Sequence, residues 1–430
     1  MAATDVRSAW ASKTMLTTSC DDDRMAQSTS VDHRDDPTQE LASGPVRFGV
    51  ILLFAIVSRA VYWNQQPPDM RIFLEPWMNH ILRYGQVQAF AHPFSNYEPA
   101  YLYLLALGSF AHGVLTTMTI IKILSVAGRL FLTLALADLL KAAGLNARAA
   151  VLALVLPSVV INDALLGQCD ALWAGACILA LAGMIRGRTL RSLVWCGVAI
   201  SFKALAVFIA PVIIGALIAR RAPIWQWTVP ALVFLASLVP PWLLGWPGYD
   251  LLTVYLGQAS LEPLIAGRLG NPWMLVTIFA EDQARHFYVF GISAAVAISV
   301  PIALLAKRAW NNPRVLILLG ALAGTVLPYL LPKMLERYYF LGDVMTLAVA
   351  LSFKNRSATV AALAVQMASV LSHMTYLYSF DQPYPALAGA VCATIGIVAM
   401  CQLLKPSLDS LIASIRSDWD RLSRRSVDVT

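Results

Sequence analysis

The sequence predicts an all-α integral membrane protein that crosses the bilayer about twelve times. Of its 430 residues, 58% are hydrophobic and only 13% are charged, which leaves too little polar surface for a soluble globule of this size. Apolar runs of about 18 or more residues recur from Val46 to Leu404, and each can cross a hydrocarbon core as a helix. A large first outer loop carrying interfacial helices completes the predicted fold.

The polar ends of the chain frame a transmembrane domain at residues 46–404. Residues 1–45 are polar and lack the pattern of a secretory signal, which predicts a disordered cytoplasmic tail. Residues 405–430 are expected to form a cytoplasmic amphipathic tail. Within it, residues 408–421 place apolar side chains at helical spacing and are expected to lie along the inner membrane surface.

Basic residues gather in short clusters between the apolar runs. The clusters lie at 141–148, 186–191, 220–221, 307–314 and 354–356, and from 405 onward. The positive-inside bias predicts that all of them are cytoplasmic. The net charge of +7 therefore reflects membrane topology, and nucleic acid is not an expected partner.

This topology holds only if Pro99–Ala111 does not cross the membrane, and the stretch is short for a span. Residues 65–119 are therefore predicted to form one outer loop with two interfacial or re-entrant helices. Two short apolar runs, 190–202 and 204–218, are predicted to form a tight pair that reaches the outer face and returns, with Lys203 at the turn.

The predicted outer face collects most of the isolated charged residues, and the active surface is expected there. These residues are Asp69, Glu75, Glu98, Asp163, Asp170, Lys203, Glu262, Arg268, Lys333, Glu336, Arg337 and Asp343.

Asp69 lies just after the first membrane-length run and just before an amphipathic segment. In that segment Phe73, Trp77 and Ile81 recur every four residues, which indicates a helix with one apolar side. A proline after Glu75 is tolerated in a first helical turn. We therefore expect the helix to begin near Glu75 and to lie flat with its aromatic side chains in lipid, leaving Asp69 in a short loop.

A carboxylate at the membrane surface suits chemistry on a lipid-linked substrate. The alternative is that Asp69 only forms a turn with Pro67 and Pro68.

Three cations are candidates for binding an anion. Lys203 interrupts an apolar run, so it either binds an anionic group or extends its amine to the interface. Lys333 and Arg337 lie one turn apart if that segment is helical, and two cations on one face can hold a phosphate. The alternative there is that Glu336 forms a structural ion pair with a neighbouring cation.

Gln168 and Asp170 stand at the outer start of a predicted span, where they either orient a sugar or cap the helix. The histidines of the outer loop lack metal-ligand spacing, and four of the six cysteines fall inside apolar helices. We assign no metal or other cofactor, and leave a divalent-ion requirement open.

Five segments together resemble the GT-C superfamily of polytopic membrane glycosyltransferases, which use polyprenyl-phosphate sugars, and especially its bacterial hexosyl- and mannosyltransferases. The segments are 69–77 (DMRIFLEPW), 96–105 (NYEPAYLYLL), 166–173 (LGQCDALW), 202–205 (FKAL) and 334–338 (MLERY). Each is weak alone, but their order and spacing make the joint signal fairly specific. The resemblance covers roughly residues 46–353.

The resemblance implies inverting transfer of a hexose, mannose or glucose, to a lipid-linked or secreted glycan acceptor. It implies that Asp69 is the general base. Lys203, Lys333 and Arg337 are the candidate ligands of the donor phosphate. Glu75, Gln168, Asp170 and Glu336 are the candidate sugar or acceptor contacts.

In a bacterial cell the expected location is the inner membrane, with the active site on the periplasmic face and membrane lipid around it. Three positions depart from the family pattern, namely Glu98, Leu335 and the residues after Lys203, and these departures leave specificity open.

A secondary transporter or lipid-linked glycan flippase is the rival hypothesis, because many helices with a few intramembrane charges also suit alternating access. Such proteins commonly carry internal repeats and interrupted helices, and the sequence shows neither. A catalytically silent scaffold of the same fold is a third possibility.

Overall fold

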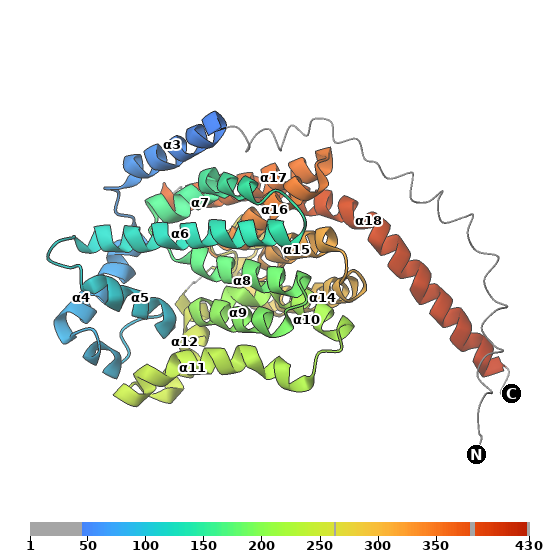
Figure 1. Cartoon of the computed structure of the whole chain (residues 1–430), viewed down its shortest axis with the longest axis horizontal. Helices are drawn as coiled ribbons and strands as arrows, with labels where there is room; N and C mark the ends of the chain where they lie inside the picture. The colour runs from blue at the N-terminus through green and yellow to red at the C-terminus, as the bar shows by residue number, and fades with distance from the viewer. Residues whose placement is uncertain (1–44, 262–263, 379–382, 428–430) are drawn as a thin grey trace, which may run out of the picture.

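The computed structural model describes residues 45–261, 264–378 and 383–427 (Figure 1). Residues 1–44 of the predicted tail, and Glu262, lie outside the described residues. Within these ranges the chain is built from helices and contains no β-strand, which confirms the all-α prediction.

Six described helices are long and apolar enough to cross a membrane, and a seventh span results if Ala147–Val155 and Pro157–Leu165, joined at a 60° bend, are counted as one. The six lie in α6 (Thr117–Ala142), η6 with α11 (Ile224–Leu244), η7 with α14 (Glu281–Arg308), α15 (Pro313–Leu330), α17 (Arg356–Leu377) and the first part of α18 (Tyr384–Val427). Five further apolar helices have 10–17 residues and are too short to cross alone. A membrane-embedded protein is supported, whereas about twelve spans are not confirmed.

The core of the bundle is α8 (Asp170–Ile185), which is almost entirely buried between α6 and α9 (Thr189–Phe202). Small residues allow this close packing. A Cβ on Gly183 would lie 3.2 Å from the backbone of Ser192 on α9. Figure 1 shows α6, α8 and α9 running side by side, with α4 (Glu75–Tyr84) and α5 (Pro99–Ser109) at one end and α18 leaving from the other.

The predicted first outer loop, residues 65–119, contributes most of a second apolar core at one end of the bundle. Its α5 has only 11 residues, too few to span a membrane, as predicted. The prediction that the aromatic side of α4 lies in lipid is wrong. Trp77 is only 4% exposed and packs on Tyr97, with ring centroids 5.0 Å apart. The residues around α5 cover this side because they supply an apolar surface of their own.

The chain breaks at Lys203, whose backbone is extended, but the flanking helices do not form the predicted tight pair. Instead, α9 packs on α8 and α11 (Val229–Leu244), whereas α10 (Ala210–Ala219) packs mainly on α14. The break directs the two short helices to different neighbours.

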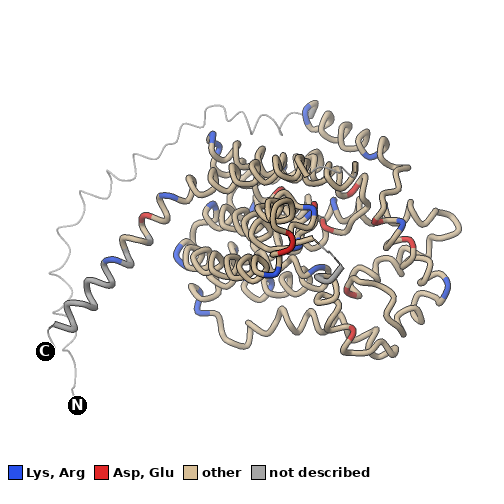
Figure 2. Tube along the Cα trace, turned by 180° about the vertical axis from the view of Figure 1, so that it is seen from behind, with Lys and Arg blue, Asp and Glu red and all other residues tan. Residues whose placement is uncertain are grey.

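The last helix and the basic loops lie at the end of the bundle opposite α4. Figure 2 shows many Lys and Arg residues at the end from which α18 extends. Residues 408–421 belong to α18 itself, which is one continuous helix rather than a span followed by a separate surface helix. That they lie along the membrane surface stays a prediction.

Two acidic residues expected on the outer face are buried anchors. Asp163 lies 2.9 Å from Arg59 of α3 (Pro45–Tyr62) and 3.1 Å from Arg129 of α6, so it ties both helices to the bend at 156. Asp343, on α16 (Phe340–Phe353), accepts hydrogen bonds from Ser369 of α17 at 2.7 and 2.9 Å.

Candidate active site

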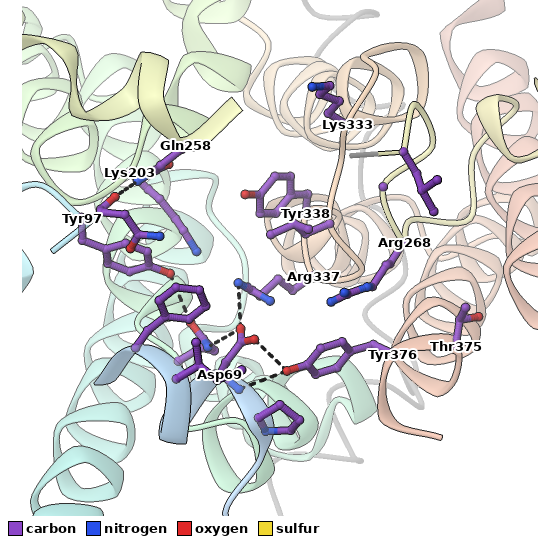
Figure 3. Close-up of a pocket in the computed structure, with 18 of the residues that line it drawn as sticks. Asp69, Tyr97, Lys203, Gln258, Arg268, Lys333, Arg337, Tyr338, Thr375 and Tyr376 are labelled. Carbon is purple, nitrogen blue, oxygen red and sulfur yellow. Dashed lines mark hydrogen bonds and ion pairs between the residues drawn. The ribbon is translucent and has the colours of Figure 1, made fainter. Parts of the chain in front are cut away.

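A cavity of about 880 Å³ opens where the first outer loop meets the bundle (Figure 3). Its walls come from the start of η1 (Met70–Leu74), the break before η5 (Ala204–Ile209), the chain around 264–268 and 333–338, and the end of α17. The charged residues that line it are Asp69, Lys203, Arg268, Lys333 and Arg337. Residues that are far apart along the amino-acid chain therefore meet in one cavity.

Asp69 lies in the first helical turn, with φ −58° and ψ −36°, and not in the predicted loop. The helix starts at Pro68 and continues through η1 into α4, because the prolines pre-set helical φ and need no amide partner in a first turn. The amide of Met70 donates to the Pro67 carbonyl, so the turn after the prolines does form. The Asp69 side chain, however, points into the cavity (Figure 3).

Both carboxylate oxygens of Asp69 have partners. Oδ2 lies 3.1 Å from Nη2 of Arg337 and accepts a hydrogen bond from Nε2 of Gln168 at 3.2 Å. Oδ1 accepts from the Tyr376 hydroxyl at 2.7 Å, and the same hydroxyl accepts from the Asp69 amide at 3.2 Å. The Asp69 side chain keeps 14% of its surface exposed. The carboxylate is thus fixed in position and still open to the cavity.

Asp170 lies behind the cavity wall and is completely buried. Its carboxylate accepts from Nζ of Lys203 at 2.6 Å, from Asn162 at 2.8 Å and from the indole of Trp173 at 2.8 Å. The N-cap residue of its helix is Cys169, and Asp170 is the first helical residue. Lys203 is 2% exposed, so it does not reach the interface as a snorkelling lysine would.

Arg337 joins the two carboxylates of the site. Its guanidinium contacts Asp69, forms an ion pair with the adjacent Glu336, and lies 3.8 Å from Asp170. The prediction that Lys333 stands one helical turn from Arg337 is wrong, because residues 331–335 are bent or extended rather than helical and Lys333 has a left-handed φ of 60°. Figure 3 shows the two side chains on different parts of the cavity wall.

The buried part of the site holds more negative than positive groups. Three carboxylates, on Asp69, Asp170 and Glu336, share two cations, on Lys203 and Arg337. Burial alone would lower the pKa of Lys203, but the Asp170 carboxylate more than offsets that effect and raises it. Burial likewise opposes the charge of Arg337, whereas Glu336 and Asp69 raise its pKa. Both side chains are therefore held as cations.

The structure brings the predicted site residues together, with the exception of Glu75. Gln168 lines the cavity and donates to Asp69, whereas Glu75 is outside it and bonds to Gln66. Glu336 is fully buried behind Arg337, as its alternative reading as a structural ion pair predicts. Tyr376 was missed, because one tyrosine near the end of an apolar helix carries no signal in the sequence.

No protein-family model matches this chain, and a search of curated proteins finds no match. Among the described residues, no cluster of three or more His, Cys, Asp or Glu is placed to hold a metal ion.

Proposed function

We propose that this protein is an inverting membrane glycosyltransferase that moves a hexose, mannose or glucose, from a polyprenyl-phosphate donor to a lipid-linked or secreted glycan acceptor. One observation carries the proposal: a fixed but accessible carboxylate, Asp69, shares a cavity with several cations where the outer loop meets the bundle. The motif resemblance to GT-C enzymes supports the same reading.

The proposed reaction needs a base on one side of the sugar and positive charge on the other. The acceptor hydroxyl oxygen attacks the anomeric carbon and forms the new glycosidic bond, while its proton passes to Asp69. The bond from the anomeric carbon to the phosphate oxygen breaks, and its electron pair stays on the phosphate. A preorganised cation stabilises that growing charge more in the transition state than in the ground state.

The cavity suits a sugar in size and in lining. Its volume of about 880 Å³ is within the usual range for small-molecule sites. Phe73, Trp77 and Tyr97 contribute aromatic surface, and Gln168 and Asn96 contribute polar groups. Aromatic rings can cover the apolar face of a hexose while amides hydrogen-bond its hydroxyl groups.

Asp69→Asn tests the base directly, because it keeps the shape of the side chain and removes the proton acceptor. Hexose transfer should fall by at least about a hundredfold, with little change in expression or donor binding. The matched control is Glu75→Gln, a carboxylate six positions along the same helix whose side chain lies outside the cavity. Transfer from radiolabelled polyprenyl-phosphate hexose by purified protein is the measurement. Wild-type turnover in Asp69→Asn would remove Asp69 as the base.

One observation favours the rival function, a secondary transporter or lipid-linked glycan flippase. The two helices joined at the 60° bend form an interrupted span, which the sequence does not reveal, and transporters use such spans at their binding sites. The acidic residue of the segment after this bend, Asp163, already forms ion pairs with Arg59 and Arg129. The glycosyltransferase is therefore the better-supported function, and we propose a bacterial inner membrane with a periplasmic active site as its location.

A further inference from the structure

The two buried cations of the cavity are already neutralised by carboxylates. Lys203 is bound to Asp170, and Arg337 is shared between Asp69 and Glu336. The side chains of both cations are less than a tenth exposed. A phosphate that bound to them would leave a buried carboxylate without its partner, which is strongly destabilising. These cations are better suited to holding the carboxylates than to holding a donor phosphate.

Arg268 is in a different environment on the same cavity. It is exposed, and its guanidinium lies 5.1 Å from the centre of the Tyr376 ring. Within the described ranges no carboxylate lies within ion-pair distance of it. Stacking on the ring leaves the edge of the guanidinium, which carries its N–H donors, available to a ligand.

Backbone contacts hold Arg268 and Lys333 on one wall. The Lys333 amide donates to the Ile265 carbonyl at 2.7 Å, and the Arg268 amide donates to the Met334 carbonyl at 3.1 Å. Gly267, with φ +61°, permits this approach, because a Cβ there would lie 2.2 Å from the Met334 oxygen. Lys333 lines the same cavity with its amine 5.8 Å from the centre of the Tyr288 ring. The two cations are thus presented from segments locked to each other.

We propose that Arg268 binds the phosphate of the polyprenyl phosphate, an inference that rests on the proposed function. Arg268 supplies a planar fork that matches phosphate oxygens, and Lys333 adds positive charge to another part of the same cavity. Figure 3 shows Arg268 beside Tyr376, whose hydroxyl holds Asp69. A phosphate bound by Arg268 then lies beside the ring whose hydroxyl group holds the proposed base. Lys203 and Arg337 act as positioning residues for Asp170 and Asp69.

The test measures binding rather than turnover. Farnesyl phosphate, farnesyl diphosphate, farnesol and inorganic phosphate are titrated into the purified full-length protein in detergent, and tryptophan fluorescence or the thermal midpoint is followed. Farnesyl phosphate should bind and farnesol should not. Arg268→Gln should weaken farnesyl phosphate at least about tenfold, since a hydrogen-bonded charge is lost. Arg268→Lys should restore part of the affinity.

Arg83→Gln is the matched control, because Arg83 is also an exposed arginine stacked on a tyrosine, with its guanidinium carbon 5.5 Å from the Tyr84 ring centre, but lies outside the cavity. It should bind as wild type. Unchanged affinity in Arg268→Gln, or equal binding of inorganic phosphate and farnesyl phosphate, would overturn the proposal of a lipid-phosphate site here. Tighter binding of the diphosphate would assign the wall to a lipid diphosphate acceptor and would also overturn it.

Failure of this inference and failure of the proposed function give different results. If farnesyl phosphate binding depends on Arg268 but no donor supports transfer, the phosphate site stands and the glycosyltransferase proposal fails. If transfer and binding are both normal in Arg268→Gln, the phosphate site is wrong and the enzyme proposal stands. Asp69→Asn should keep farnesyl phosphate affinity while losing transfer.

Discussion

Glu98, at the start of α5, is a buried carboxyl group whose two oxygens have no hydrogen-bond partner in the described structure. Burial raises its pKa to about 8. Because that pKa lies above the value in an unfolded chain, the folded state binds the extra proton. Stability should therefore be full below about pH 4.5, the ordinary value, and should decline as the pH rises through about 8.

Glu98→Gln should remove this pH dependence, because the amide keeps the size and cannot ionise. Each pKa unit corresponds to about 1.4 kcal/mol, so at pH 9 the variant should unfold at a higher temperature than wild type. Thermal midpoints in detergent at pH 6 and pH 9 measure the effect. Glu75→Gln is the control, and its thermal midpoint should change with pH as that of wild type does. If the midpoint of Glu98→Gln also changes with pH as in wild type, Glu98 is not the titrating group.

At this scale the sequence predicted which charged residues matter better than it predicted how they pair. Asp69, Lys203 and Arg337 stand out because ionisable groups are rare in apolar chains. The partners of Asp69 were not predictable, since Gln168 and Tyr376 lie 99 and 307 positions away along the chain. Such pairings are set by packing of the whole bundle and leave no local pattern.

At the scale of elements, the close approach of two backbone segments fixes the positions of Arg268 and Lys333. Residues 265–269 and residues 333–334 are joined by three amide-to-carbonyl hydrogen bonds that Gly267 permits. Periodicity correctly indicated that α4 is amphipathic, yet it could not show what covers the apolar side. In the structure that cover is α5 and the chain before it, because Tyr97 and its neighbours offer a matching apolar surface.

Gly267→Ala should separate these two segments, because its Cβ would meet the Met334 oxygen and its backbone would stay left-handed. We expect a lower thermal midpoint and weaker farnesyl phosphate binding. Gly85→Ala is the matched control: Gly85 also has positive φ, at +87°, but nothing lies within 4 Å of its Cβ position. That variant should carry the conformational cost of its own strained backbone, about 1–3 kcal/mol, and keep full binding. Equal effects of the two substitutions on binding would contradict the account.

At the scale of the whole molecule, the cavity and the basic loops lie toward opposite ends of the bundle (Figures 1 and 2). The sequence predicted this polarity because short basic loops follow the positive-inside bias. The prediction of about twelve spans is not confirmed, because residues 147–165 and 189–219 are apolar but fold as short or bent helices. Apolar composition does not distinguish a full span from two half-length helices.

Because the cavity and the basic loops lie at opposite ends, we predict that two exposed positions, one near each end, are accessible from opposite sides of the membrane. Gln88, in the first outer loop, and Asn311, in a basic loop between α14 and α15, are both exposed. In intact cells Gln88→Cys should react with a membrane-impermeant maleimide above the wild-type background, and Asn311→Cys should react only after permeabilisation. The reverse pattern would place the cavity on the cytoplasmic side.

The most direct test of the central claim is hexose transfer by the purified protein. A panel of labelled polyprenyl-phosphate hexoses is supplied with a native lipid extract, to wild type and to Asp69→Asn, and the anomeric configuration of the product is determined. We predict transfer with inversion by wild type and almost none by Asp69→Asn. Folded wild-type protein that transfers no hexose from any donor, yet moves lipid-linked glycan across liposome membranes, would contradict the account and support the transporter.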